Sequence, residues 1–366
     1  MKKNIWLFIV LSSAGGFLLS LTGLSIGWML GTLFVAALIS FVFPNFLEAK
    51  GLPKYWLYIG QCILGIELGQ KINLSVLSVF QQHWIVIIVM LLLSILFSLL
   101  SGLALWKCSQ TNMLTSFFGT APGGLSAMPG MAEEVGANTA VVSIIQTMRV
   151  FLVILIIPIV VSLLAIIPVE SIIVQTSGPI FEIHHLLWSI VLAVIAYGGY
   201  RVGKYLKFPA PWLLGSMVGV AIMQSITSIS TGHDMIAFWP HSIMVVSQVL
   251  IAVSIGSRFH KEMFIGLKQT LVVAFISTLM LIVAMFACAY FVSKITGMAL
   301  MTTALAFAPG GIAEMATTAV VLDADSTLVV AVQVLRIIVV CLVLPPIFKI
   351  LHKWEIRKNV HTHISA

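Results

Sequence analysis

Apolar runs of about 20 residues recur along the whole length of this 366-residue chain, and they constrain its fold more than any other feature. A helix needs about 20 residues to cross the hydrocarbon core of a bilayer. Hydrophobic residues make up 60% of the chain and charged residues 8%, which leaves too little polar surface for a water-soluble domain. The sequence therefore predicts an all-α membrane protein whose main partner is the lipid bilayer.

The chain also carries an internal duplication with a constant offset of 187 residues. The sequence GTAPGG at 119–124 returns as AFAPGG at 306–311, and ten of the 30 positions from 120 to 149 are identical to their partners. With a three-residue shift, WMLG at 28–31 aligns with WLLG at 212–215. Internal repeats of this kind are typical of membrane transporters. We therefore predict a first membrane repeat at 1–170, an external linker at 171–185, a second membrane repeat at 186–352 and a cytoplasmic tail at 353–366.

Each repeat contains five apolar spans and one segment whose path is ambiguous. The predicted spans are 5–20, 26–43, 56–70, 84–106 and 138–168 in the first repeat, and 186–202, 212–230, 243–257, 270–293 and 327–351 in the second. The ambiguous segments, 111–135 and 301–323, contain the APGG motifs and are too rich in Gly and Pro for an unbroken helix that faces lipid. If both segments enter the membrane and return on the same side, each repeat crosses five times and the two repeats are inverted.

The distribution of basic residues favours this inverted arrangement. With a cytoplasmic N-terminus, 15 Lys and Arg residues lie inside and only Lys71 and Lys294 lie outside, whereas full crossing of both segments gives a split of 10 to 7. Basic residues concentrate in short cytoplasmic loops. We expect about ten transmembrane helices, as two inverted five-helix repeats that each contain a re-entrant APGG hairpin. The protein is expected in the inner (cytoplasmic) membrane with both termini cytoplasmic, and its net charge of +7 does not indicate a nucleic-acid partner.

The two APGG motifs form the tips of the predicted hairpins and are candidate substrate-binding segments. Proline frees a backbone carbonyl, and glycine lets the backbone approach a ligand closely. N–H groups and helix N-termini at the tips could bind an anion, and two tight turns that only produce the bend are the alternative. The candidate residues are Pro122, Gly123 and Gly124 in the first repeat, and Pro309, Gly310 and Gly311 in the second.

Two arginines, Arg149 and Arg336, lie within apolar runs, each three residues after a glutamine, Gln146 or Gln333. That spacing places Gln and Arg on one face of a helix. A buried arginine keeps its proton and requires partners. These four residues are candidate substrate ligands for a carboxylate or another anion. In the alternative, structural role, the arginines pair with a nearby carboxylate or with the carbonyl groups of a broken helix.

Glu67 and Glu314 are the acidic residues placed deepest in the predicted membrane segments, and neither has an acidic counterpart in the other repeat. Carboxylates within a membrane are candidate ligands for protons or sodium ions. We predict both as coupling-ion residues, with an ion pair to an arginine as the alternative. The other acidic residues near the hairpins are expected at the water boundary or as helix caps, and these are Glu133, Glu134, Asp323 and Asp325.

Histidine and cysteine indicate no metal site. The four cysteines lie in or beside apolar runs without CxxC spacing, and no His pair within a predicted span has metal-ligand spacing. We therefore predict no catalytic residue, metal or cofactor, and we do not expect the chain to be an enzyme.

The doubled APGG segment, the paired W-[ML]-L-G sequences and the paired Q-x-x-R sequences resemble the AbrB-type family of duplicated membrane proteins over nearly the whole chain. That family carries two functional labels, gene regulation and ammonia oxidation by a monooxygenase. Neither follows from these residues. A copper monooxygenase needs a cluster of imidazole or comparable ligands, and a direct transcriptional regulator needs a soluble DNA-binding module.

The residues favour an ion-coupled secondary transporter of a small solute, anionic or zwitterionic, with sodium or protons as the coupling ion. The expected architecture is similar to that of carboxylate and glutamate carriers with paired re-entrant hairpins, which is a likeness of fold alone. The alternative is a membrane-embedded sensor that acts indirectly on gene expression. The sequence leaves the oligomeric state open, a homodimer included.

Overall fold

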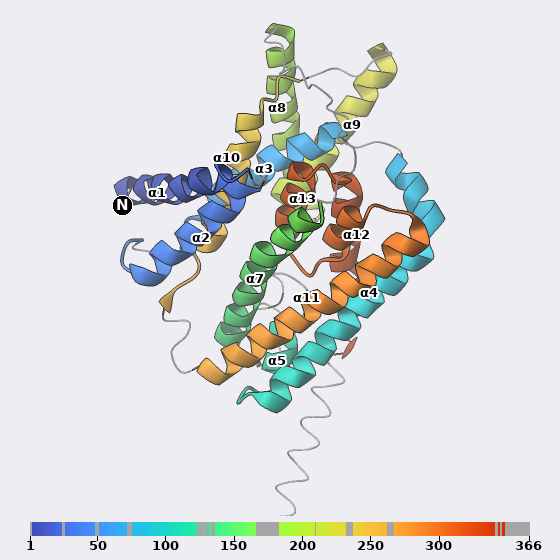
Figure 1. The fold of residues 1–366 in the computed structure, drawn as a ribbon. Helices are drawn as coiled ribbons and strands as arrows, with labels where there is room; N and C mark the ends of the chain where they lie inside the picture. Colours follow the sequence, from blue (N-terminus) through green and yellow to red (C-terminus); the bar gives the residue numbers. More distant parts are fainter. Residues whose placement is uncertain are drawn as a thin grey trace, which may run out of the picture. The chain divides into compact units, whose positions relative to one another are not determined.

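The computed structural model is helical and contains no strand in the residues that it describes (Figure 1). The described residues are 2–23, 26–47, 51–71, 75–122, 128, 132, 136–165, 183–208, 210–231, 237–261, 267–340, 343–344 and 346–347. The prediction of an all-α fold is confirmed for this part of the chain.

The chain divides into two compact units, and each unit is assembled from three separate stretches. The first unit comprises Met1–Val79, Pro158–Lys261 and Ile312–Leu328, and the second comprises Phe80–Ile157, Glu262–Gly311 and Val329–Ala366. Both units therefore combine segments of both predicted repeats.

The helices are distributed between the units as follows. The first unit contains α1 (Lys2–Ser20), α2 (Gly27–Val42), α3 (Lys54–Lys71), α8 (Ile183–Tyr205), α9 (Pro211–Thr231), α10 (His241–Gly256) and α13 (Ile312–Val321). Most of the second unit is formed by α4 (Ser75–Cys108), α5 (Met113–Thr120), α7 (Thr139–Ala165), α11 (Lys268–Thr296), α12 (Leu300–Phe307) and the helix Ser326–Val340.

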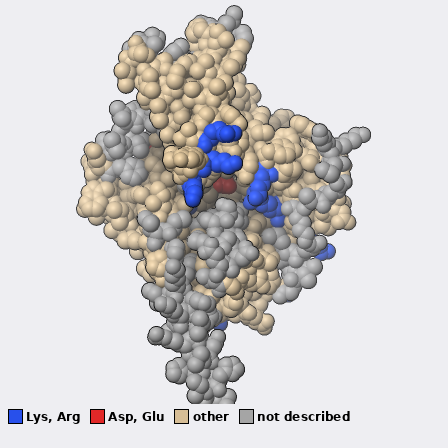
Figure 2. All heavy atoms as spheres, turned by 180° about the vertical axis from the view of Figure 1, so that it is seen from behind, with Lys and Arg blue, Asp and Glu red and all other residues tan. Residues whose placement is uncertain are grey.

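Five of the described helices, α4, α7, α8, α9 and α11, contain stretches long and apolar enough to cross a membrane. Four further predicted spans form shorter apolar helices, which are α1, α2, α10 and Ser326–Val340. The remaining predicted span, α3, is more polar because its 18 residues include Lys54, Glu67 and Lys71. Large apolar side chains are exposed on α1, α4, α8, α9 and α11, and uncharged residues cover most of the described surface in Figure 2. These features indicate a membrane protein.

Close backbone packing joins α1 to α2 and α8 to α9 in the first unit. A Cβ atom added at Gly31 would lie 2.2 Å from the carbonyl oxygen of Gly15, and one added at Gly215 would lie 2.5 Å from that of Gly199. Only glycine fits at such crossings, which are common where membrane helices pack. The crossings occupy matching positions, because Gly15 and Gly31 align with Gly199 and Gly215 under the three-residue shift.

Helices α3 and α10 cross each other in opposite directions. Near their middle, the Ser247 hydroxyl donates a hydrogen bond to the Gly60 carbonyl at 2.8 Å. At their ends, the Leu52 N–H just before α3 donates to Ser257 Oγ just after α10 at 3.0 Å. Residues 60 and 247 are partners under the 187-residue offset, so the two helices meet at equivalent positions.

The same two helices make matching contacts with their other neighbours. A Cβ added at Gly69 of α3 would lie 2.7 Å from the Met217 carbonyl of α9, and one added at Gly256 of α10 would lie 2.8 Å from the Leu33 carbonyl of α2. Gly69 aligns with Gly256, and Leu33 aligns with Met217. Helix α3 therefore packs on α9 in the way that α10 packs on α2.

In the second unit, the end of α4 meets the start of α11, and the two helices run in opposite directions (Figure 1). Gln269 Nε2 at the start of α11 donates to the Cys108 carbonyl at the end of α4 at 3.1 Å. Leu105 of α4 and Leu271 of α11 share a buried apolar cluster with Ile145 of α7. Helices from corresponding places in the two predicted repeats thus run in opposite directions in this unit as well.

Candidate functional site

Both APGG motifs follow directly on the end of a helix. Helix α5 ends at Thr120, and α12 ends at Phe307, one residue before an alanine in extended conformation. Ala121 has φ −60° and ψ 137°, and Ala308 has φ −55° and ψ 136°. Proline excludes the helical conformation from the residue that precedes it, so Ala-Pro ends both helices at the same point. Pro122, Pro309, Gly310 and Gly311 lie in or beside these breaks, and Gly123 and Gly124 lie outside the described residues.

In the first repeat, Gln146 and Arg149 of α7 hydrogen bond to the carbonyl end of α5. Gln146 Nε2 donates to the carbonyls of Phe118 at 2.9 Å and Ala121 at 2.8 Å. Arg149 Nη1 donates to the carbonyls of Thr120 at 2.7 Å and Ala121 at 3.0 Å. The last carbonyls of a helix have no partner within it, so the Gln–Arg pair satisfies groups that the break has exposed.

In the second repeat, Gln333 and Arg336 do the same at the end of α12. Gln333 Nε2 donates to the carbonyls of Leu305 at 2.9 Å and Ala308 at 3.1 Å. Arg336 Nη1 donates to the Ala308 carbonyl, and Nη2 donates to the Gly310 carbonyl at 2.5 Å. Each contact of Gln333 repeats a contact of Gln146 at an offset of 187 residues.

The two arginines are buried cations that lie near each other. Each is 3% exposed, and both glutamines are fully buried. The two positive charges are close enough to repel each other. Neither arginine has an acidic partner among the described residues, and in that part of the chain Nε of each arginine and Oε1 of each glutamine make no hydrogen bond. The second unit thus contains a concentration of positive charge with unused donors and acceptors, which is suited to bind an anion.

The carbonyl ends of two broken helices are one of the partners that the sequence predicted for the arginines. The assignment of Gln146, Gln333, Arg149 and Arg336 to a bound substrate stays a prediction. One further contact gave no signal in the sequence: Ser98 Oγ of α4 donates to the Thr120 carbonyl at 2.5 Å.

Glu314 lies in the first turn of α13, which contacts α3 and α10 within the first unit. Its carboxylate interacts electrostatically with Arg258, the residue that follows α10 by two positions. Burial lowers the pKa of the Arg258 guanidinium, and Glu314 and Tyr58 act in the opposite direction. An ion pair to an arginine was the alternative to a coupling role. Arg258 is the arginine whose charge acts on this carboxylate, and the choice between the two roles stays a prediction.

Glu67 has a partner on its own helix. Its Oε1 lies 2.8 Å from Nζ of Lys71, four residues later in α3, and the side chains are 13% and 48% exposed. Lys71 and Arg258 are partners under the 187-residue offset, so each of these equivalent cations has one acidic residue near it.

Replacing Glu67 with glutamine is expected to change stability little. An i,i+4 ion pair on a helix contributes about 0.2–0.5 kcal/mol, and solvent screens the Lys71 end of this one. Thermal unfolding of the purified wild type and Glu67→Gln proteins in one detergent measures the effect. A fall in Tm larger than about 4 °C would show that the pair contributes more than a surface interaction does.

Comparison with known proteins now places the chain in a family. A family model described as "Transition state regulatory protein AbrB" matches residues 28–352. The chain belongs to the AbrB family. It is 54% identical over 361 residues to "Uncharacterized protein YhjN" of Bacillus subtilis (strain 168), which covers 96% of this chain and 93% of that protein. It is 27% identical over 318 residues to "Putative regulator AbrB" of Escherichia coli (strain K12), which covers 84% of this chain and 86% of that protein.

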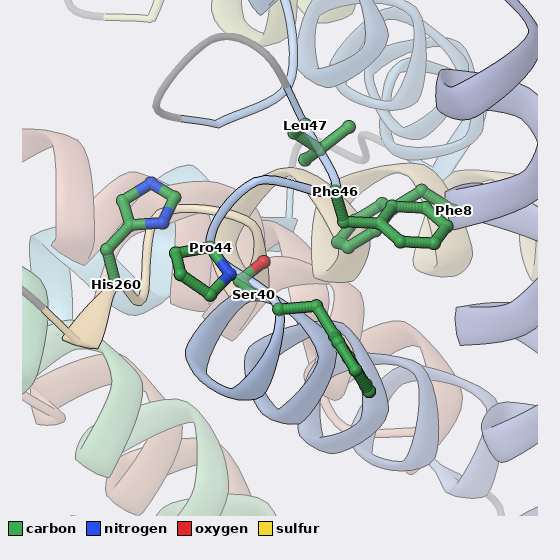
Figure 3. A pocket seen from close by; sticks show the side chains of 7 residues that line it. Phe8, Ser40, Pro44, Phe46, Leu47 and His260 are labelled. Carbon is green, nitrogen blue, oxygen red and sulfur yellow. The ribbon is translucent and has the colours of Figure 1, made fainter.

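Elsewhere in this AbrB-family protein, the first unit has a shallow depression on its surface (Figure 3). It is lined by Phe8, Ser40, Phe43, Pro44, Phe46, Leu47 and His260. Most of these side chains are apolar, and none was predicted as a site residue.

The four other acidic residues near the APGG segments of the AbrB-family chain divide into two groups. Asp325 Oδ1 accepts a hydrogen bond from the Leu328 N–H at 2.9 Å at the start of the helix Ser326–Val340, which is the cap that the sequence predicted. Asp323 lies in the preceding turn with φ 53°. Glu133 and Glu134 lie outside the described residues.

Proposed function

We propose that this AbrB-family protein is an ion-coupled secondary transporter of a small solute, anionic or zwitterionic, built from two inverted five-helix repeats. The observation that carries the proposal is the pair of buried Gln–Arg motifs at matching positions, each bound to the carbonyl end of a broken helix. Transporters with inverted repeats bind their substrates at broken helices near the middle of the membrane.

The antiparallel pairs support the inverted topology. Helices α3 and α10 occupy equivalent places in the sequence repeat and cross in opposite directions at residues 60 and 247. Helices α4 and α11 are also equivalent and antiparallel. Repeats related by an axis in the membrane plane require this orientation, whereas parallel repeats exclude it. Ten spans, with 111–135 and 301–323 as re-entrant hairpins, satisfy this symmetry and keep the termini cytoplasmic.

The helix breaks support a site rather than a simple bend. Non-helical backbone at membrane depth is tolerated where it is enclosed by protein or lines a wet cavity. Here Gln146, Arg149, Gln333 and Arg336 enclose it and leave hydrogen-bonding atoms unused. The arginines and the Pro-Gly backbone would hold the solute, and Glu314 or Glu67 would bind the coupling ion, sodium or a proton.

Uptake by the purified protein in proteoliposomes tests the proposal. Labelled small carboxylates, amino acids and inorganic anions are offered with an inward proton gradient, with an inward sodium gradient or with neither. Accumulation of one solute above equilibrium, dependent on one gradient and absent from protein-free liposomes, is the expected result. No gradient-dependent flux of any ligand that binds the protein would contradict a transport function.

Replacing Glu314 with glutamine is expected to lower gradient-driven accumulation of the solute at least about 10-fold, while exchange of solute across the membrane continues. Glutamine keeps the shape of the side chain but cannot take up a proton or neutralise a sodium ion. Uptake and counterflow are measured on the same proteoliposome preparation, with Glu67→Gln tested in parallel. Full accumulation by both variants would contradict the assignment of coupling to either carboxylate.

A membrane-embedded sensor is the second candidate, and the regulatory description of the family favours it. Such a protein binds its ligand without moving it and passes the signal to a cytoplasmic partner. Saturable binding without flux, together with a ligand-dependent partner at the short basic loops, distinguishes it from the transporter.

A further inference from the structure

We infer that the ligand of the site in the second unit is a small oxyanion with net negative charge, held jointly by Arg149 and Arg336. This inference rests on the transport function proposed above in one respect, which is that the bound anion is also the transported solute. Of the two solute classes proposed above, this inference keeps anions and excludes zwitterions. Carboxylates, sulfate and phosphate are the anions that fit the site.

The first argument for an anion is the charge balance of the second unit. Its described residues include the buried pair Arg149 and Arg336 and not one Asp or Glu. The carbonyl end of a helix is equivalent to about −0.5 charge, so α5 and α12 offset at most about half of the two positive charges. Among the described residues, a net charge of at least about +1 therefore remains in a buried, apolar setting. Such charge is costly unless an anion compensates it.

The second argument is that Nε of each arginine is a hydrogen-bond donor without a described partner. Nη1 of Arg149 and both Nη atoms of Arg336 donate to backbone carbonyls, which fixes the position of each guanidinium. Nε of Arg149 and Nε of Arg336 make no hydrogen bond among the described residues. An N–H of arginine and an oxygen of a carboxylate, sulfate or phosphate form a charge-assisted hydrogen bond. Each repeat thus supplies one such donor for the proposed anion.

The absence of a described carboxylate in this unit argues against a zwitterion. The ammonium group of an amino acid would add to the positive charge of Arg149 and Arg336 and would find no anionic partner there. The unused Oε1 atoms of Gln146 and Gln333 are neutral acceptors, which a hydroxyl group of the solute or a water can satisfy.

Four acidic residues of the second unit lie outside its described part and need a direct test, namely Glu133, Glu134, Glu262 and Glu355. Glu133 and Glu134 follow the first APGG motif by nine and ten residues, and they are the internal counter-ions that compete with the proposed anion. If they neutralise the arginines, the wild type shows no preference for anions, and the double variant Glu133→Gln/Glu134→Gln acquires one.

The experiment measures binding to the purified full-length protein at constant ionic strength, by isothermal calorimetry and by ligand-induced thermal shift. The probes are sulfate, phosphate, succinate and acetate as anions, glycine as a zwitterion and glycerol as a neutral solute. We expect at least one anion to bind, with glycine and glycerol inert. Arg149→Gln and Arg336→Gln should each weaken the binding of that anion about 10- to 100-fold, because a hydrogen bond to a charged group contributes about 1.5–3 kcal/mol.

Matched variants separate the charge from folding. Lys294→Gln removes the same charge from an exposed residue of the same unit and should leave binding unchanged. Arg149→Lys and Arg336→Lys keep the charge but lose the planar guanidinium, and they should retain the preference for anions over glycine with weaker affinity. If the glutamine variants do not fold, the wild-type probe series and the lysine variants still decide the question.

The outcomes distinguish this inference from transport itself. Anion binding that depends on both arginines, together with no flux in proteoliposomes, would support the anion site and contradict the transport function. If the protein takes up a zwitterion or a cation, and neither Arg→Gln variant changes that uptake, the result would support the transport function and contradict the anion site. Preference of the wild type for glycine or glycerol over every anion overturns the inference as well.

Discussion

Replacing Gly199 with leucine is expected to eliminate folded protein. A Cβ at this position would lie 2.2 Å from the Gly215 carbonyl oxygen and 3.0 Å from the Gly215 carbonyl carbon. Both atoms belong to the backbone of α9, so α8 and α9 must separate to admit any side chain. Overpacking a well-packed interior costs about 1–3 kcal/mol, and displacing a whole helix costs more. Fluorescence-detected size-exclusion chromatography of solubilised membranes should show loss of the monodisperse peak.

The adjacent glycine provides the control. Gly198 lies in the same turn of α8, and a Cβ added there would meet nothing within 4 Å. Gly198→Leu should therefore give a peak like that of the wild type and a similar Tm. Equal tolerance of leucine at 198 and 199 would contradict the close crossing of α8 and α9, and with it the matching of this crossing to that of Gly15 and Gly31.

Replacing Arg336 with leucine is expected to destabilise the protein by about 2–5 kcal/mol. The change leaves the carbonyls of Ala308 and Gly310 without their donor, and a buried polar group without a partner costs about 1–3 kcal/mol. Relief of the repulsion from Arg149 offsets part of this loss. Thermal unfolding of the ligand-free protein in detergent measures the difference.

Two further variants locate the source of the effect. Arg336→Lys retains the charge and one donor and should lose less stability than Arg336→Leu. Lys294→Leu removes a cation from an exposed site near the Tyr290 ring, 5.7 Å from its centroid, and should cost less than about 1 kcal/mol. If Arg336→Leu is as stable as the wild type, Arg336 does not hold the end of α12 in place.

The duplication made much of the fold predictable. The offset of 187 residues located both helix breaks, because Ala-Pro stops a helix wherever it occurs in an apolar run. Apolar runs predicted the helices of both repeats, although α3 is more polar than the others because three charged residues lie in its 18 residues. The glycines at 31 and 215 were visible as part of a repeated sequence. Their partners at 15 and 199 depend on how the helices pack, which no local pattern specifies.

The site was predictable as a set of residues but not as a set of contacts. The three-residue spacing placed Gln146 beside Arg149 on one helical face, and the repeat supplied the second pair. The approach of these side chains to carbonyls 25 to 29 residues earlier in the chain is a tertiary contact that spacing alone cannot give. An arginine partner for Glu314 was one of the predicted alternatives, but its identity as Arg258 was unpredicted for the same reason.

The inverted repeat underlies both the transport proposal and the shared anion site, and the sidedness of two equivalent lysines tests it most directly. Lys107 and Lys294 are exposed residues in the last turns of α4 and α11, and they are partners under the 187-residue offset. Each is replaced in turn by cysteine in a background without the native cysteines. Intact cells and inside-out vesicles are then treated with a membrane-impermeant maleimide. We predict that Lys294→Cys is labelled in intact cells and that Lys107→Cys is labelled only in inside-out vesicles. Labelling of both cysteines from the same side would contradict the inverted repeat.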